Sequence, residues 1–264
     1  MMYGAYQNLK ITRDGPILTI TLDNPPSNAV TKAMHRELAD IFSDINRDAE
    51  TKVVILTGAG DRIFCAGGEF SAMRESIENP QAAVASMQEG IRLIHSLLAL
   101  EKPIIARING HAIGFGATLA LFCDLIYAVD TAKIGDPHVL VGYAAGDGGA
   151  LIWPQMIGYA RAREFLLTGD TLLGAEAATI GLITRAVKTE SLNETVNAIA
   201  RRLAEGATIA INATKQAINM SLRRQFDALI EAHIGLELMS HFSNDHVEAV
   251  AAMLEKRTPR FSGT

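Results

Sequence analysis

The sequence is short of cysteine and of basic residues, and each shortage excludes a class of protein. Its 264 residues include only two cysteines, Cys65 and Cys123. Two are too few for a disulfide framework, and neither has the close Cys or His neighbours of a metal site. The 24 Lys and Arg are outnumbered by 29 Asp and Glu, giving a net charge of −5, so no basic excess exists to neutralise a phosphate backbone. We therefore expect a protein of a reducing compartment that does not bind nucleic acid or a metal.

A long uninterrupted apolar run is also lacking. Residues 103–129 come closest, but Arg107 and Asp124 interrupt them, so we interpret this segment as buried core rather than a membrane span. Residues 1–10 (MMYGAYQNLK) lack the basic start and apolar stretch of a signal peptide. We expect no membrane association and a cytoplasmic location.

The hydrophobic pattern alternates between strand and helix in the first two thirds of the chain. Residues 15–22 (GPILTITL) alternate like a strand and end in the turn-forming sequence DNPP. Alternating strands and helices favour parallel pairing. The remaining predicted elements are helices at 31–46, 81–100 and 117–122 and strands at 52–57, 104–107 and 125–129.

After residue 160 the pattern becomes helical throughout. This change predicts an α/β fold with a strand-rich core and a helical C-terminal region. The predicted helices cover residues 160–168, 174–180, 190–205, 207–224 and 225–239.

Two turns rich in small residues are the first candidates for chemistry. One is Ile63–Phe70 (IFCAGGEF), and the other is Asn109–Thr118 (NGHAIGFGAT), which lies between a predicted strand and a predicted helix. The free amides and positive dipole end of a helix N-terminus favour an anion or a developing oxyanion. Taken alone, each turn is equally compatible with a tight connection whose glycines supply positive φ.

Both turns, together with their flanks, resemble the crotonase superfamily, also called the enoyl-CoA hydratase/isomerase family. The resemblance covers nearly the whole chain. Its segments are NPPSNA at 24–29, VVILTG at 53–58, FCAGGE at 64–69, KP to GAT at 102–118, CD at 123–124, LTG at 167–169 and EKRTPRF at 255–261.

The resemblance implies a crotonase-like spiral of ββα repeats over residues 1–200 and a helical trimerisation region over residues 201–264, assembled as a homotrimer or a dimer of trimers. It further implies a coenzyme A thioester as substrate, with no separate cofactor. In this family two backbone amides hold the thioester oxygen as it becomes an enolate, and by position these belong to Cys65 and Phe115. Phe115 departs from the more usual glycine and must narrow or reshape the acyl pocket. The implied substrate-binding residues are Ala29, Gly67, Glu69, Gly114, Thr118 and Phe261.

A larger departure concerns proton transfer. Family hydratases use two glutamates, and the corresponding positions here hold Thr118 and His138. His138 is followed nine positions later by Asp147, and a loop between them could fold back so that Asp147 accepts the imidazole N–H. That contact would fix the tautomer and make His138 a base for water. On the alternative interpretation, His138 is a structural polar residue and Asp147 a turn former.

The spacing of His138 and Asp147, with Asp147 inside a GDGG run and a Trp-Pro pair after it, is similar to the branch of the family that hydrolyses carbon–carbon bonds in β-diketones. That branch carries a histidine where this chain has Phe115. Three hypotheses therefore stay open at this point. They are an acyl-CoA enzyme in which His138 and Asp147 activate water for hydration or C–C cleavage, a double-bond isomerase, and a catalytically silent acyl-CoA-binding paralogue.

Overall fold

Two β-sheets form the core of the computed structural model, which describes residues 3–264, with the backbone alone at residues 70–72. The larger sheet has the order β1-β2-β3-β5-β7-β10 and the smaller one β4-β6-β8-β9. All pairings are parallel except β1 with β2 and β8 with β9. The strands are β1 (Leu9–Asp14), β2 (Ile17–Leu22), β3 (Val53–Gly58), β4 (Ile63–Cys65), β5 (Ile104–Ile108), β6 (His111–Ile113), β7 (Leu125–Val129), β8 (Lys133–Gly135), β9 (Thr171–Leu173) and β10 (Arg185–Val187).

The chain follows a spiral in which each turn adds one strand to each sheet and then a helix. The first turn is β3, β4 and the helices α2 and α3, the second is β5, β6 and α4, and the third is β7, β8, the short helix η1 and α5. The predicted spiral of ββα repeats is therefore confirmed. The helices are α2 (Phe70–Glu78), α3 (Pro80–Leu98), α4 (Phe115–Leu121), η1 (His138–Val141) and α5 (Gly149–Thr168).

Local sequence explains the elements that frame the site. Helix α1 (Lys32–Arg47) begins where the Thr31 hydroxyl accepts a hydrogen bond from the Met34 amide at 3.1 Å. Met34, Leu38 and Ile41 recur at helical spacing and are fully buried, each contributing about 1.5 to 3 kcal/mol to folding. Strand β3 is buried along its whole length, as expected for a parallel strand covered on both faces.

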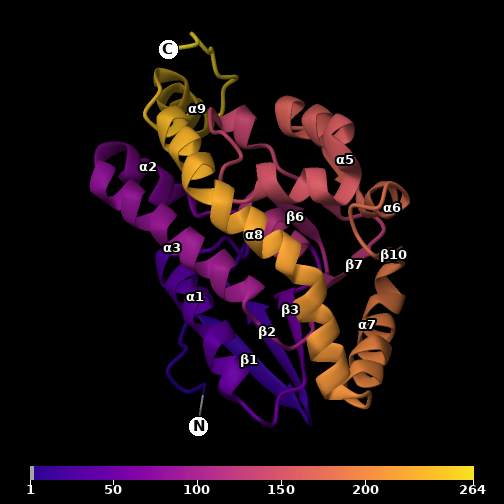
Figure 1. The fold of residues 1–264 in the computed structure, drawn as a ribbon. Helices are drawn as coiled ribbons and strands as arrows, with labels where there is room; N and C mark the ends of the chain where they lie inside the picture. Colours follow the sequence, from indigo (N-terminus) through magenta and orange to yellow (C-terminus); the bar gives the residue numbers. More distant parts are fainter. Residues whose placement is uncertain (1–2) are drawn as a thin grey trace.

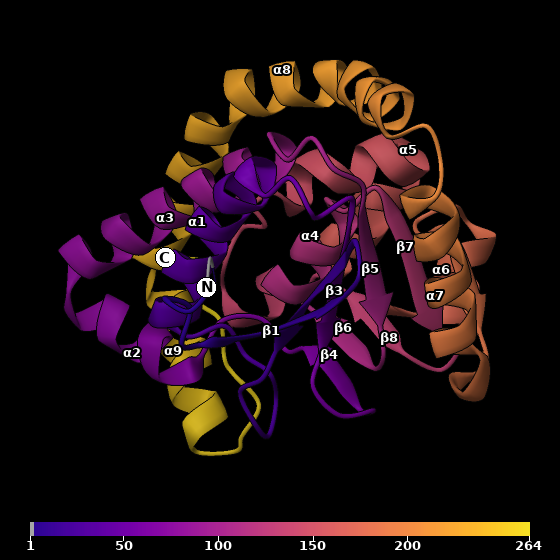
Figure 2. The same cartoon turned by 90° about the horizontal axis from the view of Figure 1, so that it is seen from below.

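Four helices make up the C-terminal region. They are α6 (Gly174–Thr179), α7 (Thr189–Ala204), α8 (Thr208–His241) and α9 (Asn244–Leu254). Helix α8 packs against α3 and α5 and crosses over them on the outside of the sheets (Figures 1 and 2). The structure corrects the prediction of separate helices at 207–224 and 225–239, because no proline or glycine stands between them and the two join as α8.

The structure also tests the helix predicted at residues 160–168 and the interpretation of residues 103–129 as buried core. Helix α5 begins at Gly149 rather than at residue 160 and is broken at Gly158, whose φ is 76°, which explains why periodicity showed only its second half. Residues 103–129 form β5, β6, α4 and β7, most of them buried, as the core interpretation requires. Within residues 3–264, no helix combines the length and apolar character needed to cross a membrane. Helix α7 runs through residue 200 to Ala204. The boundary at residue 200 between the spiral core and the trimerisation region stays a prediction.

Candidate active site

The two glycine turns meet at one point of the fold. Helix α4 starts directly after Gly114, whose φ of 56° requires glycine. Its first turn lies against the end of β4, because a Cβ atom added to Gly116 would come 2.4 Å from the Cys65 carbonyl oxygen. A Cβ atom on Gly67 would stand 3.7 Å from the Phe115 nitrogen. Glycine at these positions therefore lets the first turn of α4, which carries the predicted Phe115 amide donor, approach the turn that carries the predicted Cys65 donor.

The thiol of Cys65 plays no part in this arrangement. It is fully buried, and burial raises its pKa to about 12, so it remains protonated and is a poor nucleophile. Its Sγ atom lies 3.7 Å from the Gly67 carbonyl oxygen. Phe115, in contrast, is the first residue of α4, and the amides of a first helical turn have no partner within the helix.

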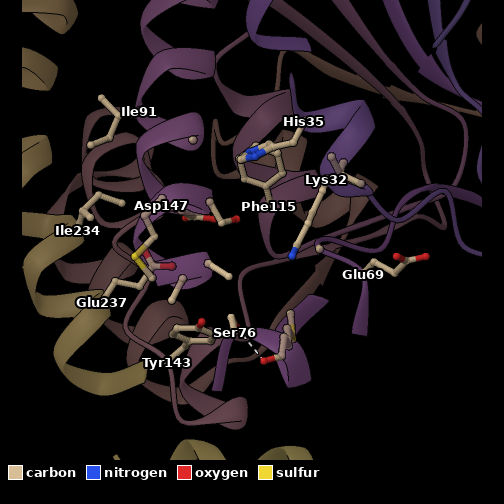
Figure 3. A pocket seen from close by; sticks show the side chains of 18 of the residues that line it. Lys32, His35, Glu69, Ser76, Ile91, Phe115, Tyr143, Asp147, Ile234 and Glu237 are labelled. Carbon is tan, nitrogen blue, oxygen red and sulfur yellow. Dashed lines mark hydrogen bonds between the residues drawn. The ribbon is translucent and has the colours of Figure 1, made fainter. Parts of the chain in front are cut away.

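A cavity of about 980 Å³, its mouth included, opens beside the turns. Figure 3 shows ionisable side chains on opposite sides of it, with Lys32 and Glu69 on one side and Glu237 on the other, and apolar side chains such as Ile234 among them. Helices α1, α2, α3, α4 and α8 and the segment after η1 all contribute walls. Its lining includes Val30, Lys32, His35, Gly68, Glu69, Met73, Ser76, Met87, Gly90, Ile91, Phe115, His138, Tyr143, Asp147, Ile230, Ile234 and Glu237.

The other predicted site residues lie at various distances from this cavity. Gly114 borders His138, since a Cβ atom there would stand 3.8 Å from the ring carbon Cε1. Thr118 is fully buried, with its hydroxyl 3.4 Å from an Asp147 oxygen. Ala29 and Gly67 immediately precede the lining residues Val30 and Gly68. Phe261 is 47% exposed on the C-terminal segment and does not line the cavity.

The imidazole of His138 stands between two carboxylates. It is the first residue of η1, and its Nε2 atom lies 3.5 Å from Asp147 Oδ2. Its Nδ1 atom contacts Asp136 Oδ1. The structure thus brings His138 and Asp147 together, and it adds a second carboxylate that sequence reasoning did not single out.

Asp136 is positioned to fix the orientation of the His138 ring through its contact with Nδ1. Its side chain is fully buried, and Gly149 leaves the space for it, because a Cβ atom on Gly149 would come 2.0 Å from Asp136 Oδ2. That Oδ2 atom has no hydrogen-bond partner among the residues that the structure describes. Asp136 stands only two positions before His138, and this proximity was the one sequence signal that could have indicated it.

These contacts decide the charge of the site. Burial alone would lower the pKa of His138, but Asp136 and Asp147 outweigh burial and raise it well above 6.5. Burial raises the pKa of Asp147, and the nearby His138 opposes this increase. Burial and the nearby Asp147 also raise the pKa of Glu237. The two carboxylates therefore favour the protonated imidazole, whose two N–H groups can each donate to one of them.

Three more side chains in the cavity gave no signal in the sequence. Glu237 reaches the site from α8, and its Oε2 atom has no partner within residues 3–264. His35, on α1, packs edge-on against Phe115 with ring centres 5.2 Å apart, and burial lowers its pKa to about 4, so it is neutral. Tyr143 lies with its ring centre 6.1 Å from that of His138.

Asp136, His138 and Asp147 are also spaced like metal ligands, with one ligand atom from each within 4.8 Å of the others. The two carboxylates, however, contact different nitrogens of one ring. A single ion bound at one nitrogen could not replace both contacts. We therefore interpret the group as a hydrogen-bonded proton-transfer unit.

Comparison with known proteins places the chain in a family. Residues 12–264 match the enoyl-CoA hydratase/isomerase family model. A short-chain-enoyl-CoA hydratase of Clostridium acetobutylicum is 31% identical over 95% of both chains, and a crotonyl-CoA hydratase of Syntrophomonas wolfei is 32% identical over 97% of this chain and 98% of that one.

Solved structures agree with this placement. An enoyl-CoA hydratase/isomerase from Mycobacterium paratuberculosis has a TM-score of 0.88 at 29% identity, covering 92% of this chain and 97% of that one. A β-diketone hydrolase from the cyanobacterium Anabaena, bound to (S)-3-oxocyclohexyl acetic acid, has a TM-score of 0.83 at 31% identity, covering 91% and 96%. The spiral of ββα repeats, the paired glycine turns and these matches together show that this chain belongs to the crotonase superfamily, the enoyl-CoA hydratase/isomerase family.

Proposed function

We propose that this enzyme binds an acyl-CoA thioester, holds its enolate with the Cys65 and Phe115 amides, and uses His138 and Asp147 to activate water. The observation that carries the proposal is the imidazole of His138, which faces the cavity with a carboxylate at each ring nitrogen. The reaction that fits best is hydrolytic cleavage of the carbon–carbon bond between the α-carbon and a β-keto group.

In this reaction, water adds to the β-carbonyl carbon and gives up a proton to the His138–Asp147 pair. The bond between the α-carbon and the β-carbon then breaks, and its electron pair moves onto the thioester as an enolate. The Cys65 and Phe115 amides stabilise the enolate oxygen, and each such donor is worth about 3 to 4 kcal/mol. The proton returns from the pair to the α-carbon, which releases a carboxylic acid and a shortened acyl-CoA.

The residues around His138 suit both proton transfers. Asp136 accepts from Nδ1, so that Nε2 is the nitrogen that faces Asp147. The raised pKa of His138 makes the neutral ring a stronger base and leaves the protonated ring able to donate to carbon. Thr118 supports Asp147 through the 3.4 Å contact but cannot itself ionise.

Hydration of an enoyl-CoA is the second candidate, and the hydratase names of the curated relatives favour it. It needs water activation and protonation of the α-carbon, which family hydratases divide between two glutamates. Here Thr118 stands at one of those positions, so a single proton-transfer centre must serve both steps. We expect slow hydration, reduced by about 100- to 10,000-fold relative to an enzyme with two glutamates.

The assembly proposed with this function is a homotrimer or a dimer of trimers. Helix α8 carries strongly exposed apolar side chains, among them Ile209, Ile218 and Met239, which a partner subunit would cover. In the same proposal, the C-terminal segment with Phe261 contributes to coenzyme A binding, and the enzyme is cytoplasmic.

Turnover of crotonyl-CoA and of a cyclic β-keto acyl-CoA, with His138→Ala as control, tests the proposed function. Cleavage of the β-keto substrate that is lost in His138→Ala supports it. Fast crotonyl-CoA hydration that needs His138 favours the second candidate. Double-bond migration without water consumption would indicate an isomerase, and binding without any turnover would indicate a silent paralogue.

A further inference from the structure

Tyr143 forms a second polar feature of the cavity wall that the proposed mechanism does not use. It follows η1 in the segment that leads to Asp147, and it lines the cavity. Figure 3 shows its hydroxyl on the side of the ring that faces Glu237 and Asp147. Its ring stacks on that of His241, with centres 5.2 Å apart and planes 15° apart.

The hydrogen bonds of His241 fix the direction of the Tyr143 hydroxyl. His241 is the last residue of α8 and is buried, and its Nε2 atom lies 3.1 Å from the Ser76 carbonyl oxygen. A carbonyl oxygen only accepts, so Nε2 carries the proton. Burial lowers the pKa of His241, so the ring is neutral and Nδ1 has a lone pair. Tyr143 contacts that Nδ1 atom and must donate to it.

The Tyr143 oxygen therefore offers lone pairs, not a proton, to the cavity. The Ser76 hydroxyl also lies within hydrogen-bonding reach of the Tyr143 oxygen, but it gives its own proton to the Met73 carbonyl oxygen, 2.7 Å away. The pKa of Tyr143 is raised by burial and by nearby Glu237, so the phenol does not ionise. A neutral phenol whose proton is already engaged is a hydrogen-bond acceptor in a fixed position.

We propose that the pair of Tyr143 and His241 forms an acceptor site for an O–H group, and that its occupant is the water molecule that attacks the acyl group. This inference rests on the proposed function. His138 and Asp147 remove one proton of that water, and the Tyr143 oxygen accepts a hydrogen bond from its other O–H. Two acceptors on one water orient its lone pair toward the substrate carbon.

The test separates steps that need a nucleophilic water from a step that does not. Tyr143→Phe removes the oxygen and keeps the ring. We expect kcat for the water-dependent reaction to fall about 10- to 100-fold, the effect of misplacing a reactant, with KM little changed. Exchange of the α-protons of butyryl-CoA with D2O needs the base and the two amides but no attacking water, so we expect it to continue at the wild-type rate.

Two further variants complete the experiment. Tyr159→Phe removes the same hydroxyl from a residue that is 63% exposed on α5 and is expected to change neither reaction. His241→Gln keeps a donor for the Ser76 carbonyl but lacks the Nδ1 acceptor, which frees the Tyr143 proton. We expect the same selective loss, and the double variant with Tyr143→Phe should lose little more than either single one.

The outcomes distinguish this inference from the proposed function. Wild-type protein that neither converts any acyl-CoA nor exchanges α-protons refutes the proposed function. A wild-type enzyme that does both, with Tyr143→Phe unchanged or with both reactions reduced equally, overturns the inference alone. If Tyr143→Phe instead weakens binding of 3-hydroxybutyryl-CoA but not of butyryl-CoA, with kcat unchanged, the occupant is a substrate hydroxyl and the assignment to water is wrong.

Discussion

Replacing Asp136 by Asn removes the negative charge behind His138 and keeps the shape of the side chain. Asp136 is fully buried and contacts Nδ1, so little solvent screens the two groups from each other. An opposite charge at such a distance changes a pKa by about 1 to 3 units, equivalent to about 1.4 to 4 kcal/mol. We therefore expect the pKa of His138 to fall by about that amount in Asp136→Asn.

The sign of the effect on activity follows from the role of the base. Activity requires the deprotonated pair, so kcat/KM falls as the pH drops through its pKa. In the wild type that pKa is raised above 6.5, so the acid limb of the profile should lie above pH 6.5. In Asp136→Asn the limb should move to lower pH, while the plateau at high pH falls because the base is weaker.

The assay is kcat/KM measured from pH 5 to pH 10 for wild type, Asp136→Asn and the exposed control Asp170→Asn. Nitrogen chemical shifts of the His138 ring report the same titration independently of turnover. An acid limb at the same pH in wild type and Asp136→Asn, with unchanged ring titration, would refute the positioning role of Asp136.

Three more predictions follow from the site. Phe115→Pro removes one amide donor at a helix position that tolerates proline, so kcat should fall about 100- to 1,000-fold. Phe115→Ala keeps the donor and should alter mainly the acyl preference. Equal kcat in the two variants would contradict the role of that amide. Gly116→Ala places a Cβ atom 2.4 Å from the Cys65 carbonyl oxygen. The midpoint of thermal denaturation should therefore fall and turnover should be lost. An unchanged midpoint would contradict the close approach of these two segments. His138→Ala and Asp147→Asn should each reduce turnover severely, and the double variant should lose little more than the worse single one, whereas additive losses would show that the two act separately.

The larger elements of the fold could be predicted from the sequence because their hydrophobic periods are long. Helix α1 and strand β3 came from the spacing of residues such as Leu38 and Val54. Strands β4, β6 and β8 have three residues each, which is too short for a period to show. No proline or glycine separates 207–224 from 225–239, so the backbone can continue as one helix, and α8 packs against α3 and α5.

The residues of the candidate site also fall into two groups, those that stand in local sequence motifs and those that packing brings to the cavity. Cys65, Phe115, His138 and Asp147 could be proposed because they stand in local motifs, and their roles stay predictions. Glu237 lies on α8, 90 positions after Asp147, and only the packing of that helix over the core brings its carboxyl group to the cavity. No spacing rule connects residues so far apart in sequence, so their meeting could not be predicted from one chain.

The most direct test of the account is the fate of oxygen from labelled water. The enzyme is incubated with a cyclic β-keto acyl-CoA in H2(18O), and the product is analysed by mass spectrometry beside His138→Gln. We expect a ring-opened product with one 18O in its new carboxyl group, formed by the wild type and not by His138→Gln. An intact carbon skeleton, together with fast crotonyl-CoA hydration that is indifferent to His138→Gln, would contradict it.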